Sequence, residues 1–100
     1  MAAPGIELSD GGLVDLEGVV DFLWRRGEAL ARRFSEEYDA AVLAARDFPL
    51  LGAPLSRGER RIRIGSGPYR LIYTIREDGI VVIIAVAHTS RRPGYWRERL

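Results

Sequence analysis

The C-terminal stretch of residues 87–100, AHTSRRPGYWRERL, holds most of the side chains in this sequence that could do chemistry. It contains the only histidine of the chain, His88, with four arginines, a tyrosine and a tryptophan. Histidine is the side chain that most readily exchanges a proton near neutral pH, so His88 is the candidate general acid or base. Arginine binds phosphate through planar, bidentate donors, and aromatic rings stack on bases. This residue set is typical of a site for phosphate or nucleic acid.

A second group of arginines is predicted to lie on one face of a strand. In RRIRI, residues 60–64, Ile62 and Ile64 alternate with Arg61 and Arg63. Alternation with a period of two is the pattern of a strand with one buried face, so the other face carries the guanidinium groups. Such a face is either simply solvated or binds an anion.

Pairing of the two strands that follow would bring these groups together. Residues 69–76 and 80–86 flank the tight turn EDG, and a hairpin across it places His88 close to Tyr69 and Arg70. We therefore expect one basic cluster with these members: Arg61, Arg63, Arg70, His88 and Arg91. Glu59 and Glu98 are the acids nearby in sequence, and they are too few to neutralise the cluster, so it is expected to need an external anion.

The predicted cluster has the groups needed to cleave RNA by transfer to the 2′-hydroxyl. That reaction needs a base, cations that stabilise the phosphorane, and an acid for the leaving oxygen. His88 would be the acid or base, and Tyr95 or Trp96 would offer a surface for a base to stack on. Structural alternatives stay open: His88 as a hydrogen-bonded residue at a strand end, the arginines as a solvated face, and Trp96 as an anchor for the tail.

Composition excludes several other classes of site. The absence of cysteine rules out a disulfide framework, a thiolate nucleophile and a Cys-containing zinc site, and a single histidine argues against a His-rich metal site. We expect no metal and no cofactor. The first residues lack the features of a signal peptide, and no apolar run approaches the roughly 20 residues that cross a bilayer. A single domain over residues 1–100, cytoplasmic and without membrane contact, is therefore expected.

Charge is distributed unevenly along the chain. Residues 1–50 contain five arginines and ten acidic residues, whereas residues 51–100 contain ten arginines and four acidic residues. All fifteen basic residues are arginine. The second half is thus the basic half, and it carries the side chains best suited to phosphate.

The remaining patterns predict the elements that position these residues. A short strand at residues 5–9 precedes a helix capped by Ser9 or Asp10 and ended by Gly27, and a second helix spans 28–46. Trp24 and Leu30 are expected on the inner apolar stripes of these antiparallel helices. A loop follows, and then three strands in an antiparallel meander, the last of them apolar at every position and so covered on both faces. The class is α+β, with a short C-terminal helix or tail.

The order and spacing of these motifs resemble the RelE/ParE superfamily of bacterial type II toxin–antitoxin toxins. YRLIY at 69–73 is similar to the family's Y-R-[hydrophobic]-x-Y core, and His88 with Arg91 is similar to its H-x-x-R ending. FPLLGAP at 48–54 resembles its F-P-x-x-G loop. The resemblance covers nearly the whole chain and implies a small α+β fold with an antiparallel sheet, an antitoxin partner and growth inhibition.

The resemblance also implies roles for the site residues. RelE-like members cut mRNA in the ribosomal A site, whereas ParE-like members poison DNA gyrase, and a fold does not choose between them. In the RelE pattern the catalytic set would be Arg70, His88, Arg91 and Tyr95, and the RNA-binding set would be Arg61, Arg63 and Trp96. Our leading hypothesis from sequence is therefore a ribosome-dependent mRNA endonuclease. The alternatives are a non-enzymatic gyrase inhibitor and a relic that only binds its antitoxin.

Overall fold

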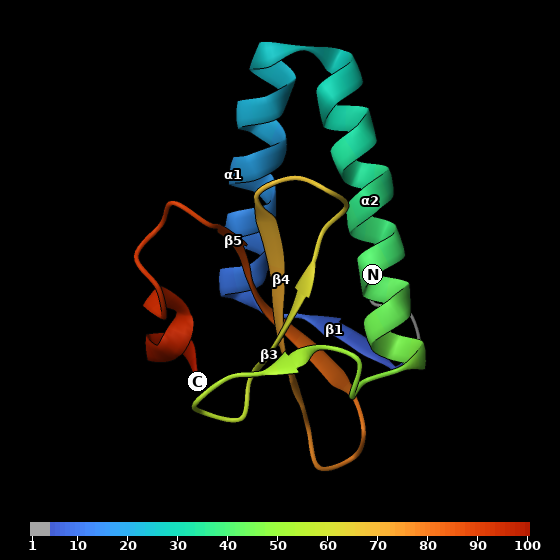
Figure 1. Ribbon diagram of the computed structural model, residues 1–100, viewed down its shortest axis with the longest axis vertical. Coiled ribbons are helices and arrows are strands. Elements are labelled where there is room, and N and C mark those ends of the chain that lie inside the picture. Colours follow the sequence, from blue (N-terminus) through green and yellow to red (C-terminus); the bar gives the residue numbers. More distant parts are fainter. Residues whose placement is uncertain (1–4) are drawn as a thin grey trace.

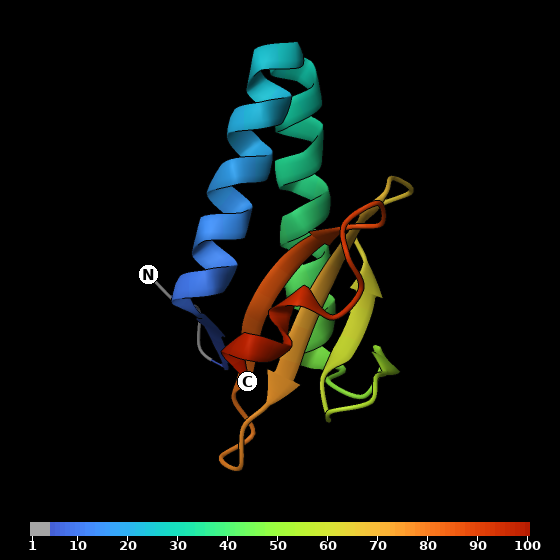
Figure 2. The same cartoon turned by 90° about the vertical axis from the view of Figure 1, so that its left-hand side faces the viewer.

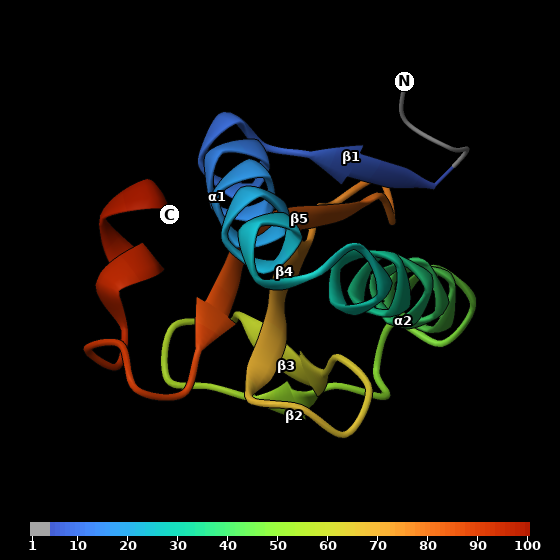
Figure 3. The ribbon, with the colours of Figure 1, turned by 90° about the horizontal axis from the view of Figure 1, so that it is seen from above.

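The computed structural model describes residues 5–100, in which two long helices pack on one face of a five-stranded sheet (Figures 1 and 3). The elements follow in the order β1 (Ile6–Leu8), α1 (Asp10–Arg26), α2 (Glu28–Asp47), β2 (Ala53–Pro54), β3 (Arg60–Arg63), β4 (Tyr69–Ile75), β5 (Val81–His88) and the 3-10 helix η1 (Tyr95–Arg99). The predicted α+β class and element order are confirmed. The edge strand β2 was not predicted, because two residues carry no detectable periodicity.

The helices begin and end where their capping residues predict. Ser9 is the N-cap of α1, and its Oγ accepts a hydrogen bond from the Gly12 N–H at 3.0 Å. At the other end the Gly27 N–H donates to the carbonyls of Leu23 and Trp24, and α2 starts at the next residue. A single glycine thus separates two antiparallel helices.

The sheet has two covered faces, which explains the continuous apolar sequence of β5. The strand order is β1-β5-β4-β3-β2, with β1 parallel to β5 and the other neighbours antiparallel. On the helix face, Leu71, Tyr73 and Val86 pack with Phe34 and Ala45 of α2. On the opposite face, the segment after β5 folds back over the sheet. Its aromatic residues Tyr95 and Trp96 pack on the strand residues Ile72, Ile84 and Ala87. We call these the helix face and the tail face, and residues 89–100 the tail (Figure 2).

A β-bulge in β5 changes which residues face the helices. Ala85 lies opposite Ile72 and Ile83 lies opposite Tyr73, so Ile84 has no partner on β4. A bulge inserts one residue and shifts the alternation of side chains beyond it. Ile83 before the bulge therefore packs on the helix face, whereas Ile84 packs with the tail.

The helical hairpin extends beyond the end of the sheet (Figures 1 and 2). Trp24 and Leu30, near the tip of this hairpin, are 55% and 48% exposed. The prediction that they belong to the core was wrong. Their stripe has the helical period of a buried face, but the sheet that buries it nearer the base does not reach the tip.

Candidate functional site

The predicted basic cluster is divided between the two faces of the sheet. Arg70 lies opposite Arg63 on β3 and opposite Ala87 on β5, while His88 lies opposite Tyr69. Side chains of successive strand residues point to opposite faces, so adjacent positions in the register do not share a face. Arg70 is on the tail face, whereas His88 is on the helix face. The expectation that these two side chains share one face was wrong, although both line the hollow beside Arg61.

His88 makes local contacts on the helix face. Its ring lies edge-on to the ring of Tyr69, with 5.1 Å between centroids. The Ser90 N–H donates to His88 Nδ1 at 2.9 Å, so a neutral ring carries its proton on Nε2. His88 borders a groove of about 500 Å³ between α1 and β5, whose α1 wall includes Val14 and Phe22. We call this the α1 groove.

The arginines of β3 and β4 form a row on the tail face that no carboxylate neutralises. Arg61, Arg63 and Arg70, here called the arginine row, have no acidic side chain within ion-pair distance among residues 5–100. Arg70 Nη1 donates to the carbonyls of Gly67 and Tyr69, each at 3.0 Å. Burial and the charges of Arg63 and Arg61 lower the pKa of Arg70. A hollow of about 280 Å³ adjoins the row.

The two aromatic residues expected to stack on bases are buried in the tail face. Tyr95 and Trp96 are 8% and 7% exposed. The Tyr95 hydroxyl donates to Asp15 Oδ2 at 2.7 Å, and Trp96 Nε1 donates to Glu59 Oε2 at 2.9 Å. Both rings therefore fasten the tail to the sheet, which matches the alternative of Trp96 as a tail anchor.

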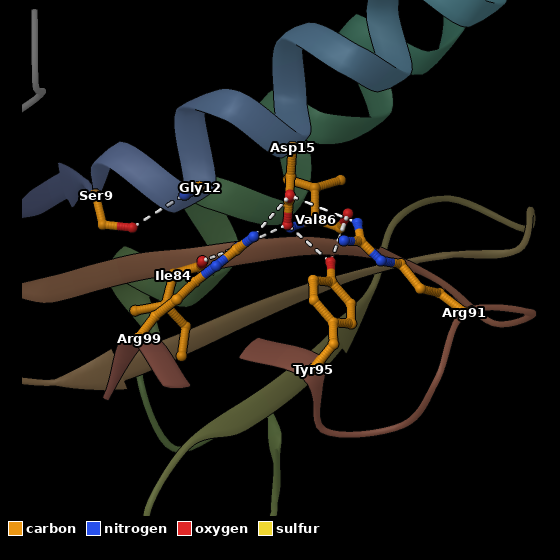
Figure 4. Close-up of polar contacts among 8 residues, drawn as sticks. All are labelled: Ser9, Gly12, Asp15, Ile84, Val86, Arg91, Tyr95 and Arg99. Atoms are coloured by element: carbon orange, nitrogen blue, oxygen red, sulfur yellow. Dashed lines mark hydrogen bonds and ion pairs between the residues drawn. The ribbon is translucent and has the colours of Figure 1, made fainter. Parts of the chain in front are cut away.

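Asp15 of α1 is the centre of a buried polar cluster at the β5 edge (Figure 4). Its carboxylate accepts from Arg99 Nη1 and Nη2 at 2.9 and 3.1 Å and from the Val86 N–H at 3.1 Å, in addition to Tyr95. Arg91 Nη1 lies 3.8 Å from Asp15 Oδ1, and its guanidinium stacks on the Tyr95 ring at 3.7 Å. Arg91 was expected to need an external anion, but the carboxylate of Asp15 partly supplies that negative charge.

The charges around Asp15 keep it ionised despite its burial. Burial alone would raise the pKa of Asp15, but hydrogen bonds from Arg99, Tyr95 and the Val86 N–H, with the charge of Arg99, hold the pKa below its ordinary value. The same contacts complete the backbone bonding of β5, because Arg99 Nη1 also donates to the Ile84 carbonyl at 2.9 Å. The Asp15–Arg99 pair thus occupies edge positions of β5 that lie beyond β1.

Glu59 fastens the other side of the tail. Its side chain is fully buried, and Oε1 accepts from the Arg57 N–H at 2.7 Å. Oε2 accepts from Trp96 Nε1 and from Arg97 Nε, the latter at 3.3 Å. Burial would raise the pKa of Glu59, yet these hydrogen bonds hold it below its ordinary value. Asp15 and Glu59 are the two buried acidic residues in the part of the chain that the structure describes, and both bind the tail.

Asp15 was missed from sequence although a signal was present. It lies four residues before Val19 and eight before Leu23, both of which pack against the core of the helix face. Side chains at this spacing share one face of a helix. An acid on an otherwise apolar stripe indicates a buried ion pair, because an unpaired buried carboxylate is too costly to keep.

Comparison with known proteins decides the family. A sequence model described as "ParE toxin of type II toxin-antitoxin system, parDE" matches residues 6–93. The chain belongs to the ParE toxin family. A search of curated proteins found no match. Among solved structures, a chain of the chromosomal ParDE toxin–antitoxin system from P. aeruginosa has a TM-score of 0.68 at 14% identity, covering 83% of this chain and 92% of that one. At that identity the likeness shows a shared fold.

As a ParE family member, the protein is the toxin of a type II toxin–antitoxin system, and its partner is a cognate antitoxin. Among residues 5–100 of this ParE toxin, neither helix has the length and apolar character that crossing a bilayer requires.

Proposed function

We propose that this toxin inhibits DNA gyrase by binding it, without cutting mRNA. The observation that carries the proposal is the match of residues 6–93 to the ParE toxin family, and the division of the predicted catalytic groups between two faces of the sheet supports it. His88 is on the helix face with Tyr69, and Arg70 is on the tail face with Arg63. Cleavage needs the acid–base group and the stabilising cations within hydrogen-bond reach of one phosphate. His88 and Arg70 line one hollow, but His88 Nδ1 already accepts from the Ser90 N–H at 2.9 Å, so this ring nitrogen is not free to take a proton.

The state of Tyr95 supports the same conclusion. Its hydroxyl donates to Asp15, and its ring lies between the sheet and the guanidinium of Arg91. A side chain held in this way is not free to position a substrate base. A toxin that acts by binding needs none of these groups to be mobile or reactive, which agrees with membership of the ParE family.

The arginine row favours one second candidate, which is cleavage or binding of mRNA on the ribosome. Like charges that lack an acidic partner attract phosphate, and the adjoining hollow is also lined by Arg91 and Trp96. In this reading Arg61, Arg63 and Arg70 would contact the RNA backbone. His88 lines the same hollow and would be the acid or base of any catalysis.

The α1 groove is the surface that we assign to the antitoxin. Val14 and Phe22 are 65% and 48% exposed and form an apolar wall of the groove, and Gly18 between them leaves open space. An amphipathic segment can lay its apolar side chains into such a groove. Arg91, which also lines the groove, favours acidic residues in that segment. Its binding would cover the groove while the toxin is inactive, in the cytoplasm where gyrase acts.

Two assays run side by side with the purified toxin test this proposal. We expect inhibition of gyrase supercoiling that is relieved by antitoxin, and intact mRNA in a translating-ribosome assay. His88→Ala should inhibit gyrase like the wild type, since it contributes no catalytic group. If the toxin cuts mRNA and leaves supercoiling unchanged, and if Arg70→Ala abolishes that cleavage, the endonuclease is the correct function.

A further inference from the structure

The loop between α2 and β2 turns three large apolar side chains toward solvent. Phe48, Leu50 and Leu51 are 67%, 71% and 63% exposed. Single exposed apolar residues are ordinary on a protein surface, but three within four consecutive residues form a continuous apolar projection. We call residues 48–51 the apolar loop. Nothing in the fold requires these side chains to be apolar, because they contribute little to the core.

Hydrogen bonds from a buried residue hold the backbone of this loop in place. The Tyr73 hydroxyl donates to the Pro49 carbonyl at 2.6 Å and accepts from the Gly52 N–H at 3.0 Å, and the Tyr73 side chain is fully buried. A Cβ at Gly52 would lie 2.5 Å from that hydroxyl, so the close approach requires glycine. The Leu51 N–H also donates to the Phe48 carbonyl at 2.9 Å. The loop is therefore ordered before any partner arrives, which lowers the entropic cost of binding.

The surroundings of the apolar loop are positively charged. Arg60 Nη1 donates to the carbonyls of Gly52 and Leu50 at 2.8 and 3.3 Å, and within residues 5–100 no carboxylate lies at ion-pair distance from Arg60. The acid next to the loop, Asp47, is paired with Arg46 at 3.0 Å. A complementary partner surface would therefore be apolar at its centre and carry carboxylates at its rim.

Shape distinguishes this surface from the α1 groove. A concave groove suits an extended or helical segment, whereas projecting apolar side chains suit a pocket on a folded protein, where a few anchors supply most of the binding energy. The two surfaces are also separate in the fold. The apolar loop leads into β2 at one edge of the sheet, while the α1 groove lies beside β5, with β3 and β4 between them.

We propose that the apolar loop is the surface through which the toxin binds its target, inserting Phe48, Leu50 and Leu51 into an apolar pocket with an acidic rim on a folded protein. The inference rests on the proposed function in naming gyrase as that protein. Arg60 then both orders the loop and meets the rim carboxylates. The antitoxin segment binds elsewhere.

The double variant Leu50→Asp/Leu51→Asp tests this inference in the full-length toxin. It should raise the toxin concentration needed for half inhibition of supercoiling by at least tenfold. Its melting temperature and its affinity for antitoxin should stay near wild type, because the replaced side chains are exposed. The matched control is Leu30→Asp, an exposed leucine at the other end of α2, which should inhibit gyrase normally. A Leu50→Met/Leu51→Met variant should retain inhibition, since it keeps the apolar surface.

Growth arrest in cells provides a readout that does not depend on the identity of the target. If the wild type arrests growth without inhibiting gyrase, the proposed function fails, and the loop is then judged by growth arrest alone, which the double aspartate variant should lose. Full activity of that variant in both assays overturns the inference. A loss of antitoxin affinity with inhibition intact also overturns it, because the loop would then serve the antitoxin. A smaller assembly of the variant than of the wild type in sedimentation overturns it as well, because the loop would then bind a second copy of the chain.

Discussion

Arginines on the tail face of the sheet occur in two contrasting settings. In the tail, Arg99 and Arg97 contact the buried carboxylates of Asp15 and Glu59 at 2.9 and 3.3 Å. In the arginine row, three side chains of the same type lie near one another without a carboxylate, and burial together with the charges of Arg63 and Arg61 lowers the pKa of Arg70. Composition alone therefore does not separate structural from functional arginines. A buried acid makes an arginine part of the fold, whereas a like-charged neighbour leaves it available to a ligand.

Asp15→Asn should have the largest effect on stability, and it tests whether the arginines of the tail are part of the fold. The amide cannot accept from Arg99, Tyr95 and the Val86 N–H as the carboxylate does, and Arg99 loses its counter-charge. Breaking a buried pair of this kind typically costs about 3–5 kcal/mol, and partial exposure of Arg99 places the expected loss at roughly 2–4 kcal/mol. Urea denaturation at neutral pH measures it. Adding Arg99→Gln to Asp15→Asn should cost much less than the sum of the two single changes.

The pH dependence of this loss has a definite sign. Because folding lowers the pKa of Asp15, its ionised form stabilises the native state above the unfolded pKa, and the stabilisation disappears as pH falls through the folded pKa. The stability difference between wild type and Asp15→Asn should therefore be constant above about pH 5 and narrow below about pH 4. A difference that grows toward acid pH would contradict the assignment of Asp15 as an ionised anchor.

Glu59→Gln should have the next largest effect. Glutamine preserves the volume of the buried side chain, but its amide group places donors against the Trp96 Nε1–H or the Arg57 N–H. A buried donor left without an acceptor costs about 1–3 kcal/mol. Trp96 fluorescence during unfolding would report both the lower midpoint and any change in packing of the tail. An unchanged midpoint would show that Trp96 holds the tail by packing alone.

Arg63→Gln should have the smallest effect on stability. Its side chain is exposed and contacts one carbonyl, that of Ser66 at 3.3 Å, so the free energy of unfolding should change by less than about 0.5 kcal/mol. Relief of repulsion in the arginine row could make the change a small gain. Equilibrium denaturation at low and high salt distinguishes these outcomes, because repulsion between exposed charges is screened by salt. A loss as large as that for Asp15→Asn would erase the distinction between the two arginine settings.

The sequence predicts the secondary structure well because the relevant signals are local. Ser9, Gly27 and the EDG turn mark boundaries that the structure confirms, and period-two alternation identifies β3. The bulge at Ile84 was beyond reach, since a run of apolar residues carries no mark of the one that lacks a partner.

The candidate site was predicted less well because it depends on long-range contacts. The hairpin register did bring His88 beside Tyr69 as expected. The prediction was wrong because it assumed that side chains close to each other along paired strands also point to the same face of the sheet. The carboxylates that hold the tail lie far from it in the chain, with Asp15 and Arg99 separated by 84 residues. No local sequence pattern indicates that Tyr95 and Trp96 are buried against the sheet.

The tail cover also has a consequence for the order in which the protein is made. Residues 6–88 contain all five strands, but the side chains of Tyr95 and Trp96, which cover Ile72, Ile84 and Ala87, leave the ribosome only after them. Cleavage between residues 88 and 95 would leave a toxin whose five strands are complete and whose tail face exposes these apolar side chains. Such fragments would be substrates for chaperones and proteases, so a truncated toxin would be degraded.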